Sequence, residues 1–221
     1  MKKVDTILFD FDGTLFDTDE LVTQSFRYSL QHYGLTKISD ERIRSTFGAV
    51  MEDIMQGFIS EFHLNATVEE LVSCYRDYHE KIFAQYIHPF EGITELLEKV
   101  SALGLKSGVL TSRKKRSAMR GIELFDYNKY FSAIQTEDDT VYAKPDPRAA
   151  YDILERMGSN AESSIIVGDT AYDILCGKNA GAITALALWG REMSNEQILD
   201  LAPDIVSHSP EEFYTSLLKF I

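Results

Sequence analysis

Residues 4–14 of the chain read VDTILFDFDGT. The first six of these residues are mostly apolar and favour strands, and the run ends abruptly in an acidic segment that contains a glycine. This pattern is typical of a buried parallel strand whose carboxyl end opens into a loop. Ligands of open α/β sheets bind beyond the carboxyl ends of the strands, so Asp10 and Asp12 are the first candidate site residues.

After residue 88 the sequence alternates between strand patterns and helix patterns. The strand patterns lie at residues 106–110, 133–136, 164–167, 182–188 and 204–207. Such alternation implies crossover connections and a parallel sheet. We therefore predict an α/β fold with a doubly wound, Rossmann-like parallel sheet.

The stretch between the first strand and residue 88 has no strand pattern. Its apolar residues recur at helical spacing in three places, and Thr67 with Glu70 has the form of a capping box. A Pro and Gly boundary follows at residues 88–92. The sequence thus predicts a discontinuous α/β core, residues 1–15 and 88–221, with an inserted all-helical cap domain at residues 16–87.

Composition narrows the class of protein. The 221 residues include 22 Lys and Arg against 35 Asp and Glu, a formal net charge of −13, which disfavours binding to nucleic acid or anionic membranes. No apolar run approaches ~18 residues, and Cys74 and Cys176 show no paired spacing. We expect a cytoplasmic protein without a membrane or nucleic-acid partner, and no feature indicates a protein partner.

Polar residues also follow the later strands. One strand pattern ends in Thr111-Ser112, another in Asp169 with Asp173 one turn further on, and Lys144 precedes a predicted helix. Carboxylates gathered at one sheet edge need a compensating cation, and oxygen ligands shared with a phosphate favour Mg²⁺. A lysine at that edge suits a phosphate group. The pattern therefore indicates phosphoryl chemistry, with Asp10 a plausible carboxylate nucleophile and Asp12 a plausible acid and base.

Four segments, in order along the chain, carry a family resemblance: residues 10–18 (DFDGTLFDT), 110–112 (LTS), 144–147 (KPDP) and 168–173 (GDTAYD). They resemble the four motifs of the haloacid dehalogenase-like phosphatase superfamily. The helical insertion resembles the small cap of this superfamily, and the subgroup that the chain resembles is that of the phosphoglycolate phosphatases.

The resemblance implies a role for each acidic residue. Asp10 would attack phosphorus and bind Mg²⁺, and Asp12 would protonate the leaving alcohol and then activate water. The Asp12 backbone carbonyl and the Asp169 carboxylate would complete the protein's share of the metal shell. Asp173 would orient a metal-bound water or Lys144.

The resemblance also implies the substrate contacts. Thr111, Ser112 and Lys144 would hold the phosphoryl group, and Ser112 stands where many relatives have Asn. Phe47 and Gly48, in a loop of the insertion, would close over the substrate.

The basic run at residues 113–116 and the segment at residues 189–191 leave alternatives open. The run is either a solvated helix start or brings Arg113 to a substrate carboxylate or second phosphate. The segment Trp189-Gly190-Arg191 follows a strand end and is a candidate rim of the site.

The function predicted is hydrolysis of a small phosphomonoester, such as a phosphoglycolate-like metabolite, with Mg²⁺ and through an aspartyl-phosphate. A β-phosphoglucomutase-like phosphomutase, an inorganic pyrophosphatase and a nucleotidase remain alternatives within the superfamily. A non-catalytic binding protein on the same fold is the alternative of another class.

Overall fold

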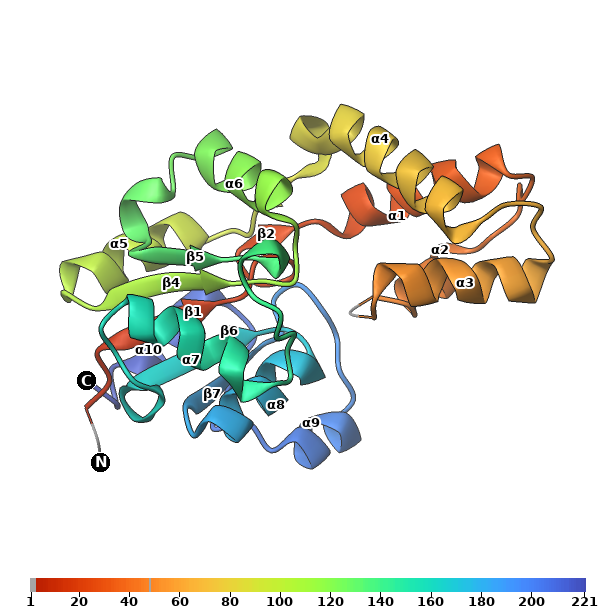
Figure 1. Ribbon diagram of the computed structural model, residues 1–221. Helices are drawn as coiled ribbons and strands as arrows, with labels where there is room; N and C mark the ends of the chain where they lie inside the picture. Colours follow the sequence, from red (N-terminus) through yellow and green to blue (C-terminus); the bar gives the residue numbers. More distant parts are fainter. Residues whose placement is uncertain (1–2, 48) are drawn as a thin grey trace. The chain divides into compact units, whose positions relative to one another are not determined.

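The computed structural model describes residues 3–47 and 49–221 (Figure 1). Its contacts divide the chain into two compact units. The α/β unit consists of residues 1–17 and 88–221, and the helical unit of residues 18–87. None of the helices in the described part of the chain has the length and apolar character needed to cross a membrane.

A six-stranded sheet forms the centre of the α/β unit. Its strands are β1 (Thr6–Phe9), β4 (Lys106–Leu110), β5 (Ala133–Gln135), β6 (Ser164–Gly168), β7 (Ile183–Ala187) and β8 (Ile205–Ser207). They lie in the order β5-β4-β1-β6-β7-β8, and every neighbouring pair is parallel. This is the order of a doubly wound sheet, in which the direction of winding reverses between β1 and β6.

Helices cover both faces of this sheet (Figure 1). The helices of the α/β unit are α5 (Ile93–Ala102), α6 (Lys115–Leu124), α7 (Pro147–Arg156), α8 (Ala171–Ala180), α9 (Asn195–Leu201) and α10 (Pro210–Leu217), with short 3₁₀ helices at Asn128–Tyr130, Glu137–Asp139 and Ala161–Ser163. Helices α7 and α8 pack on each other, as do α5 and α10. Helix α7 has Asp146 as its N-cap and Pro147 as its first residue, and the Asp146 side chain accepts a hydrogen bond from the Arg148 amide.

The helical unit contains α1 (Asp19–His32), α2 (Asp40–Arg44), α3 (Met51–Phe62) and α4 (Val68–Tyr86). Helix α4 packs against both α1 and α3, and its predicted capping box between Thr67 and Glu70 is present. The unit has an apolar core of its own, formed by Phe26, Leu30, Ile43, Met55, Phe58, Leu71, Val72 and Tyr75.

Two short strands lie where the units join along the chain. Strands β2 (Phe16–Asp17) and β3 (His88–Pro89) pair antiparallel, whereas the sequence pattern places residues 16 and 17 in the insertion. The Phe16 ring is fully buried and lies 4.4 Å from the Phe11 ring and 5.7 Å from the Tyr127 ring, measured between centroids. These contacts attach Phe16 to the α/β unit.

The predicted α/β fold class with a doubly wound parallel sheet is confirmed. The sequence pattern did not indicate α9, since none of its residues is buried and the helix therefore has no apolar periodicity. Strand β1 begins at Thr6 rather than at residue 4, although Val4 and Asp5 still donate backbone hydrogen bonds to Phe220 and Ser163.

Candidate active site

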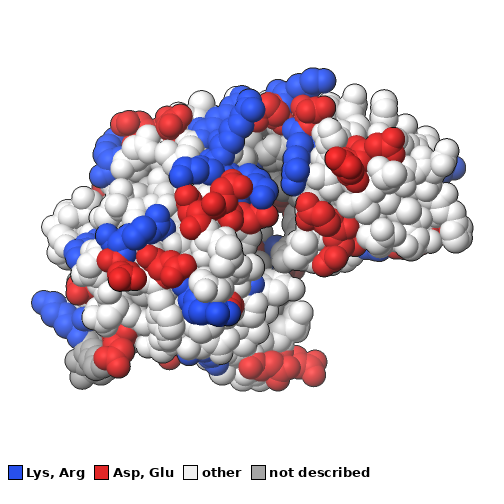
Figure 2. All heavy atoms as spheres, viewed as in Figure 1, with Lys and Arg blue, Asp and Glu red and all other residues white. Residues whose placement is uncertain are grey.

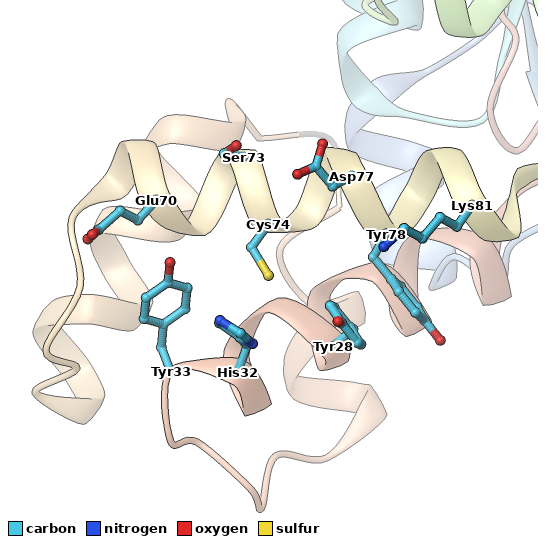
Figure 3. Close-up of a pocket in the computed structure, with 9 residues that line it drawn as sticks. All are labelled: Tyr28, His32, Tyr33, Glu70, Ser73, Cys74, Asp77, Tyr78 and Lys81. Carbon is cyan, nitrogen blue, oxygen red and sulfur yellow. The ribbon is translucent and has the colours of Figure 1, made fainter.

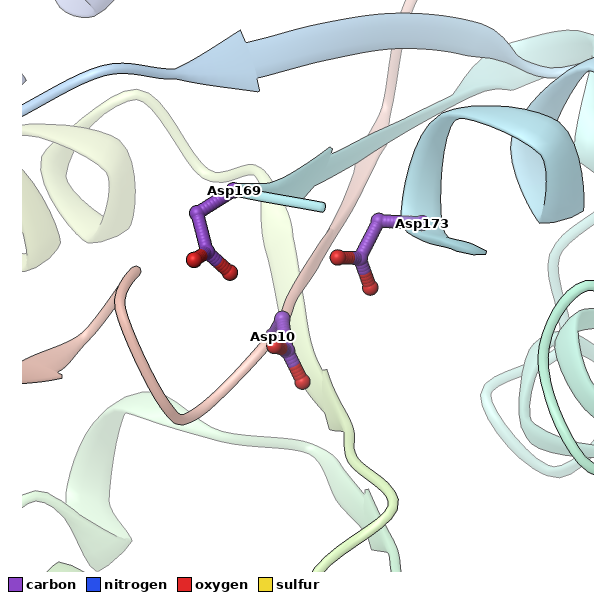
Figure 4. A group of neighbouring side chains, drawn as sticks. All are labelled: Asp10, Asp169 and Asp173. Atoms are coloured by element: carbon purple, nitrogen blue, oxygen red, sulfur yellow. The ribbon is translucent and has the colours of Figure 1, made fainter. Parts of the chain in front are cut away.

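Three aspartates meet where the two central strands end (Figure 4). Asp10 directly follows β1 and Asp169 directly follows β6, while Asp173 lies in the first turn of α8. The Asp10 amide donates to the Val167 carbonyl at 2.8 Å, which holds the two strand ends together. One carboxylate oxygen of each aspartate lies within 4.8 Å of the others, and all three residues are buried.

Lys144 supplies a positive charge to this group. Its ammonium donates to Asp10 Oδ1 at 2.8 Å, to Asp173 Oδ1, and to the Leu110 carbonyl at 3.3 Å. Its side chain is only 7% exposed, and burial by itself lowers the pKa of a lysine. The carboxylates of Asp10 and Asp173 outweigh that effect and raise the pKa of Lys144, so that the ammonium stays charged.

Both carboxylate oxygens of Asp173 bind protein donors. Oδ2 accepts from the Thr170 amide at 3.1 Å and from the Thr170 hydroxyl at 2.6 Å, and Oδ1 accepts from Lys144. The first bonds belong to the capping box of α8. A Cβ at Gly168 would lie 2.2 Å from the Asp173 side chain, so this approach needs a glycine. The arrangement suits Asp173 for orienting Lys144, which stays a prediction.

Asp169 is different, because one of its oxygens has no donor. Oδ2 lies 3.0 Å from Nε of Arg191, but Oδ1 is buried and has no hydrogen-bond partner in the described structure. A Cβ at Gly13 would lie 2.4 Å from Oδ2, so the loop after β1 can pass this close to Asp169 only because residue 13 is a glycine. The unpartnered, buried Oδ1 of Asp169 and the nearby carboxylate of Asp10 are the kind of oxygen ligands that a hard divalent cation needs. Asp10 and Asp169 could therefore hold Mg²⁺.

The pKa values of the cluster point the same way. Burial raises the pKa of Asp10 well above its ordinary value, against the lowering effect of Lys144 and with the help of the neighbouring Asp173. Burial raises the pKa of Asp169 to about 7, with a further contribution from Asp173. Without a bound metal ion, burial and mutual repulsion therefore disfavour ionisation of all three carboxylates at once, even beside Lys144.

Asp12 faces Arg113 instead of the three buried carboxylates. Nε of Arg113 donates to Asp12 Oδ2 at 3.0 Å, and Nη2 donates to Oδ1 at 2.6 Å. The Arg113 side chain is 8% exposed, while that of Asp12 is 38% exposed. Phe11 lies under the guanidinium at 5.1 Å, and Ser117 of α6 accepts from Nη1. The structure thus places Arg113 beside Asp12, and its predicted contact with a substrate carboxylate or second phosphate stays a prediction.

Thr111 follows β4 and is buried at the same end of the sheet. Its amide donates to the Gln135 carbonyl at 3.0 Å, and its hydroxyl oxygen accepts from the Arg113 amide at 3.1 Å. Ser112 is exposed. Their contacts with a phosphoryl group stay predictions.

The loop after β7 borders the cluster, as the segment at residues 189–191 suggested. Nε1 of Trp189 donates to the Thr14 carbonyl at 2.8 Å, and Arg191 reaches Asp169. A Cβ at Gly190 would lie 2.8 Å from the Gly13 carbonyl. The loop after β7 therefore packs against the loop after β1 and helps to hold it in place.

The family model of the haloacid dehalogenase-like hydrolases matches residues 7–187. The chain belongs to this family. A pyrophosphatase named PpaX, from Halalkalibacterium halodurans, is 31% identical over 211 residues, which cover 92% of this chain and 96% of the relative. The predicted family and enzyme class, a phosphatase-type hydrolase, are confirmed, and they leave the non-catalytic alternative without support.

Solved structures agree on the fold. A haloacid dehalogenase-like family hydrolase from Streptococcus pneumoniae superposes with a TM-score of 0.84 at 23% identity and covers 96% of this chain and 98% of its own. A crystal structure described as a predicted phosphoglycolate phosphatase, from Haemophilus somnus, gives a TM-score of 0.86 at 19% identity, with 97% and 98% covered. At these identities the likeness concerns the fold alone.

The site residues predicted in the insertion belong to the helical unit of this hydrolase. Phe47 is partly buried and packs against the apolar core of that unit. Gly48 lies outside the described residues. Their contact with a substrate stays a prediction.

The helical unit also contains a cavity of about 340 Å³ between α1 and α4 (Figure 3). Its walls are formed by Tyr28, His32, Tyr33, Glu70, Ser73, Cys74, Asp77, Tyr78 and Lys81. Tyr28 and Tyr78 stack with ring centroids 3.8 Å apart, and burial raises the pKa of the Cys74 thiol. Among the described residues, only the Asp10, Asp169 and Asp173 cluster of the α/β unit gathers three side chains that could share a metal.

Proposed function

We propose that this chain hydrolyses a small phosphorylated metabolite with Mg²⁺, through an aspartyl-phosphate on Asp10. One observation carries the proposal: Asp10 is buried between the ammonium of Lys144 and Asp169, whose Oδ1 has no hydrogen-bond donor among the residues that the structure describes. A nucleophilic carboxylate, a fixed cation and room for a divalent metal are what phosphoryl transfer to an aspartate requires.

In the first step, Asp10 attacks phosphorus and the bond between phosphorus and the leaving group breaks. The leaving oxygen takes the electron pair, and Asp12 gives it a proton. Lys144 and Thr111 hold the oxygens of the phosphoryl group, while Asp173 keeps Lys144 in place. The products of this step are the aspartyl-phosphate and the free leaving group.

In the second step, water attacks the phosphorus of the aspartyl-phosphate. Asp12, now without its proton, accepts one from that water, and Asp10 is released as a carboxylate together with inorganic phosphate. When bound, Mg²⁺ neutralises charge on the phosphoryl oxygens. The carboxylates of Asp10 and Asp169 and the backbone carbonyl of Asp12 would hold it.

The substrate proposed first is a phosphomonoester of a small acid, with phosphoglycolate as the reference compound. Inorganic pyrophosphate is the second candidate, because the curated relative at 31% identity carries the name of a pyrophosphatase. In either case the helical unit would act as a cap that excludes water during transfer, and the activity would be cytoplasmic.

Phosphate release from phosphoglycolate, pyrophosphate and an aryl phosphate tests the proposal, with Mg²⁺ and with excess chelator. We expect Asp10→Asn to lower kcat at least ~10³-fold, since the amide cannot form the intermediate. Asp12→Asn is expected to accumulate phosphoenzyme from the aryl phosphate, because its good leaving group needs no acid whereas hydrolysis of the intermediate needs the base.

Full activity in excess chelator would contradict the role of Mg²⁺. Turnover by Asp10→Asn at more than ~1% of the normal rate would contradict the role of the nucleophile. Mass spectrometry of the quenched Asp12→Asn protein, with the Asp10→Asn protein as control, locates the phosphoryl group.

A further inference from the structure

Arg113 occupies a defined place beside the proposed acid and base. Its guanidinium makes two hydrogen bonds to the carboxylate of Asp12, at 3.0 and 2.6 Å, and is itself shielded from water. Phe11 below it and Ser117 on α6 hold the group in position. This is a fixed cation with a planar donor fork, next to a residue whose partner is the leaving group.

The position of Asp12 determines what Arg113 meets. To pass its proton on, Asp12 must come within hydrogen-bond distance of the leaving-group oxygen. The guanidinium already lies within hydrogen-bond distance of both carboxylate oxygens of Asp12. Negative charge on the leaving group would therefore lie about one carboxyl group away from a cation that water hardly screens, where the electrostatic attraction is larger than in bulk solvent.

The outward side of the pair is open to such a group. The Asp12 side chain is 38% exposed, compared with 8% for Arg113 and 10% for Asp10. A ligand that approaches Asp10 along the exposed side of Asp12 thus meets the guanidinium behind that carboxylate. The positive charge of Arg113 behind Asp12 would attract an anionic leaving group through space, whereas a neutral alcohol would gain nothing from it.

We propose that Arg113 is a specificity-determining residue that selects substrates whose leaving group carries a negative charge. This inference rests on the proposed function. Two compounds share the chemistry: pyrophosphate, which releases phosphate, and phosphoglycolate, which releases glycolate. In both, Asp10 takes the phosphoryl group, the phosphorus–oxygen bond breaks, and the leaving oxygen receives the proton of Asp12, while the anion of the leaving group lies beside the Asp12–Arg113 pair.

Four substrates separate charge selection from a general role in holding Asp12. Pyrophosphate and phosphoglycolate have anionic leaving groups, glycerol 2-phosphate has a neutral leaving group that needs the acid, and an aryl phosphate needs neither. Arg113→Gln is expected to lower kcat/KM for the first two about 10- to 100-fold more than for glycerol 2-phosphate. The larger loss of the two, for pyrophosphate or for phosphoglycolate, identifies the source of the anion.

Matched variants show whether the loss of kcat/KM in Arg113→Gln comes from the charge, from the donor fork or from neither. Arg113→Lys keeps the charge without the fork and is expected to recover part of the selectivity. Arg148 makes a similar two-pronged contact with Asp146 at the surface of the same unit, so Arg148→Gln should not change the ratio between substrates. Equal losses of Arg113→Gln on pyrophosphate, phosphoglycolate and glycerol 2-phosphate would overturn the proposal and leave Arg113 as a residue that only positions Asp12.

Calorimetry with imidodiphosphate, which is not readily hydrolysed, gives a readout apart from turnover. The normal protein with Mg²⁺ should bind it about 10-fold or more tightly than Arg113→Gln does. Equal affinities would overturn the proposal even if no substrate were hydrolysed. If the analogue distinguishes the two proteins while no phosphate compound is turned over, the proposed hydrolysis fails and the role of Arg113 in anion selection stands.

Discussion

The two units of the chain differ in the burial of their charges: the α/β unit contains a deeply buried charged group, whereas the ion pairs described in the helical unit reach solvent. In the α/β unit, Lys144, Asp10 and Asp173 have side chains only 7, 10 and 1% exposed. In the helical unit, the pairs Arg42–Glu61 and Arg44–Asp19 have side chains that are 38 to 43% exposed. Removing ions from water costs free energy that their attraction does not always recover. The buried group is therefore expected to serve chemistry, and the exposed pairs to serve solubility.

The charged surface of the chain supports the expectation that the exposed pairs serve solubility. Acidic and basic side chains are interspersed on the visible face (Figure 2), and the chain carries a formal net charge of −13. Exposed pairs of this kind contribute little to stability. We therefore expect Lys144, Asp10 and Asp173, which are buried, to matter more for the chemistry than the exposed pairs of the helical unit do.

The largest effect on stability is expected from Lys144→Met. The substitution removes the cation and leaves Asp10 and Asp173 buried against each other, which should lower the free energy of unfolding by about 3–5 kcal/mol at pH 8. Turnover should be lost as well. Urea unfolding measures the first effect, and Arg44→Met in the helical unit, which removes an exposed cation, is the control. A normal free energy of unfolding for Lys144→Met would break the comparison.

The sequence predicts which residues gather at the sheet edge better than it predicts which side chains pair there. Asp10, Asp169 and Thr111 end neighbouring parallel strands, and the sheet geometry alone brings such residues to one edge. The pairing of Arg113 with Asp12 spans 101 positions and depends on side-chain directions that no periodicity encodes.

The elements that sequence reasoning missed share one physical property, which is that they lack a readable pattern. Strands β2 and β3 have two residues each, too few for an alternation of buried and exposed side chains. Helix α9 buries none of its residues, so only its capping box at Ser194 and Gln197 signals its start. The direction of Phe47 depends on packing inside the helical unit.

The second prediction concerns pH and metal. The folded pKa of Asp169 is about 7, above the ordinary value of 3.8, so the folded state binds more protons than the unfolded state between these values. The contribution of Asp169 to the free energy of unfolding of the metal-free protein is therefore full at low pH. It is lost as the pH rises towards 7, and the loss is no more than about 4 kcal/mol. We expect the Tm in chelator to fall by several degrees from pH 5 to pH 8.

Mg²⁺ should remove most of this slope, because it binds the ionised carboxylates of the folded state only. Thermal unfolding with and without Mg²⁺ at each pH measures the effect, and Asp169→Asn, which cannot titrate, should show a shallower slope in chelator. A metal-free Tm that rises between pH 5 and pH 8 would show that the buried carboxylates do not oppose one another.

A smaller effect is expected from Phe47→Ala in the helical unit. Loss of a partly buried ring should cost about 1–3 kcal/mol of stability. If Phe47 also closes over the substrate, kcat/KM for phosphoglycolate should fall several-fold more than for acetyl phosphate, which is too small to reach a cap. Phe62→Ala removes a ring that packs on the same core and is the control. Equal losses on both substrates would limit Phe47 to packing and would sharpen the division between the units.

The smallest effect is expected for the exposed pair of Arg42 and Glu61. Arg42 also lies over the Phe58 ring at 4.9 Å, so Arg42→Gln alone would mix two interactions. A double-mutant cycle with Glu61→Gln isolates the pair, and we expect a coupling within experimental error. Salt screens exposed charges, and the screening length falls from about 8 Å at 0.15 M to about 3 Å at 1 M, so any coupling seen at low salt should weaken steadily towards 1 M. A clear coupling that persists at about 1 M salt would mean that the helical unit depends on an exposed ion pair for its stability, and the contrast between the buried group and the exposed pairs would then fail.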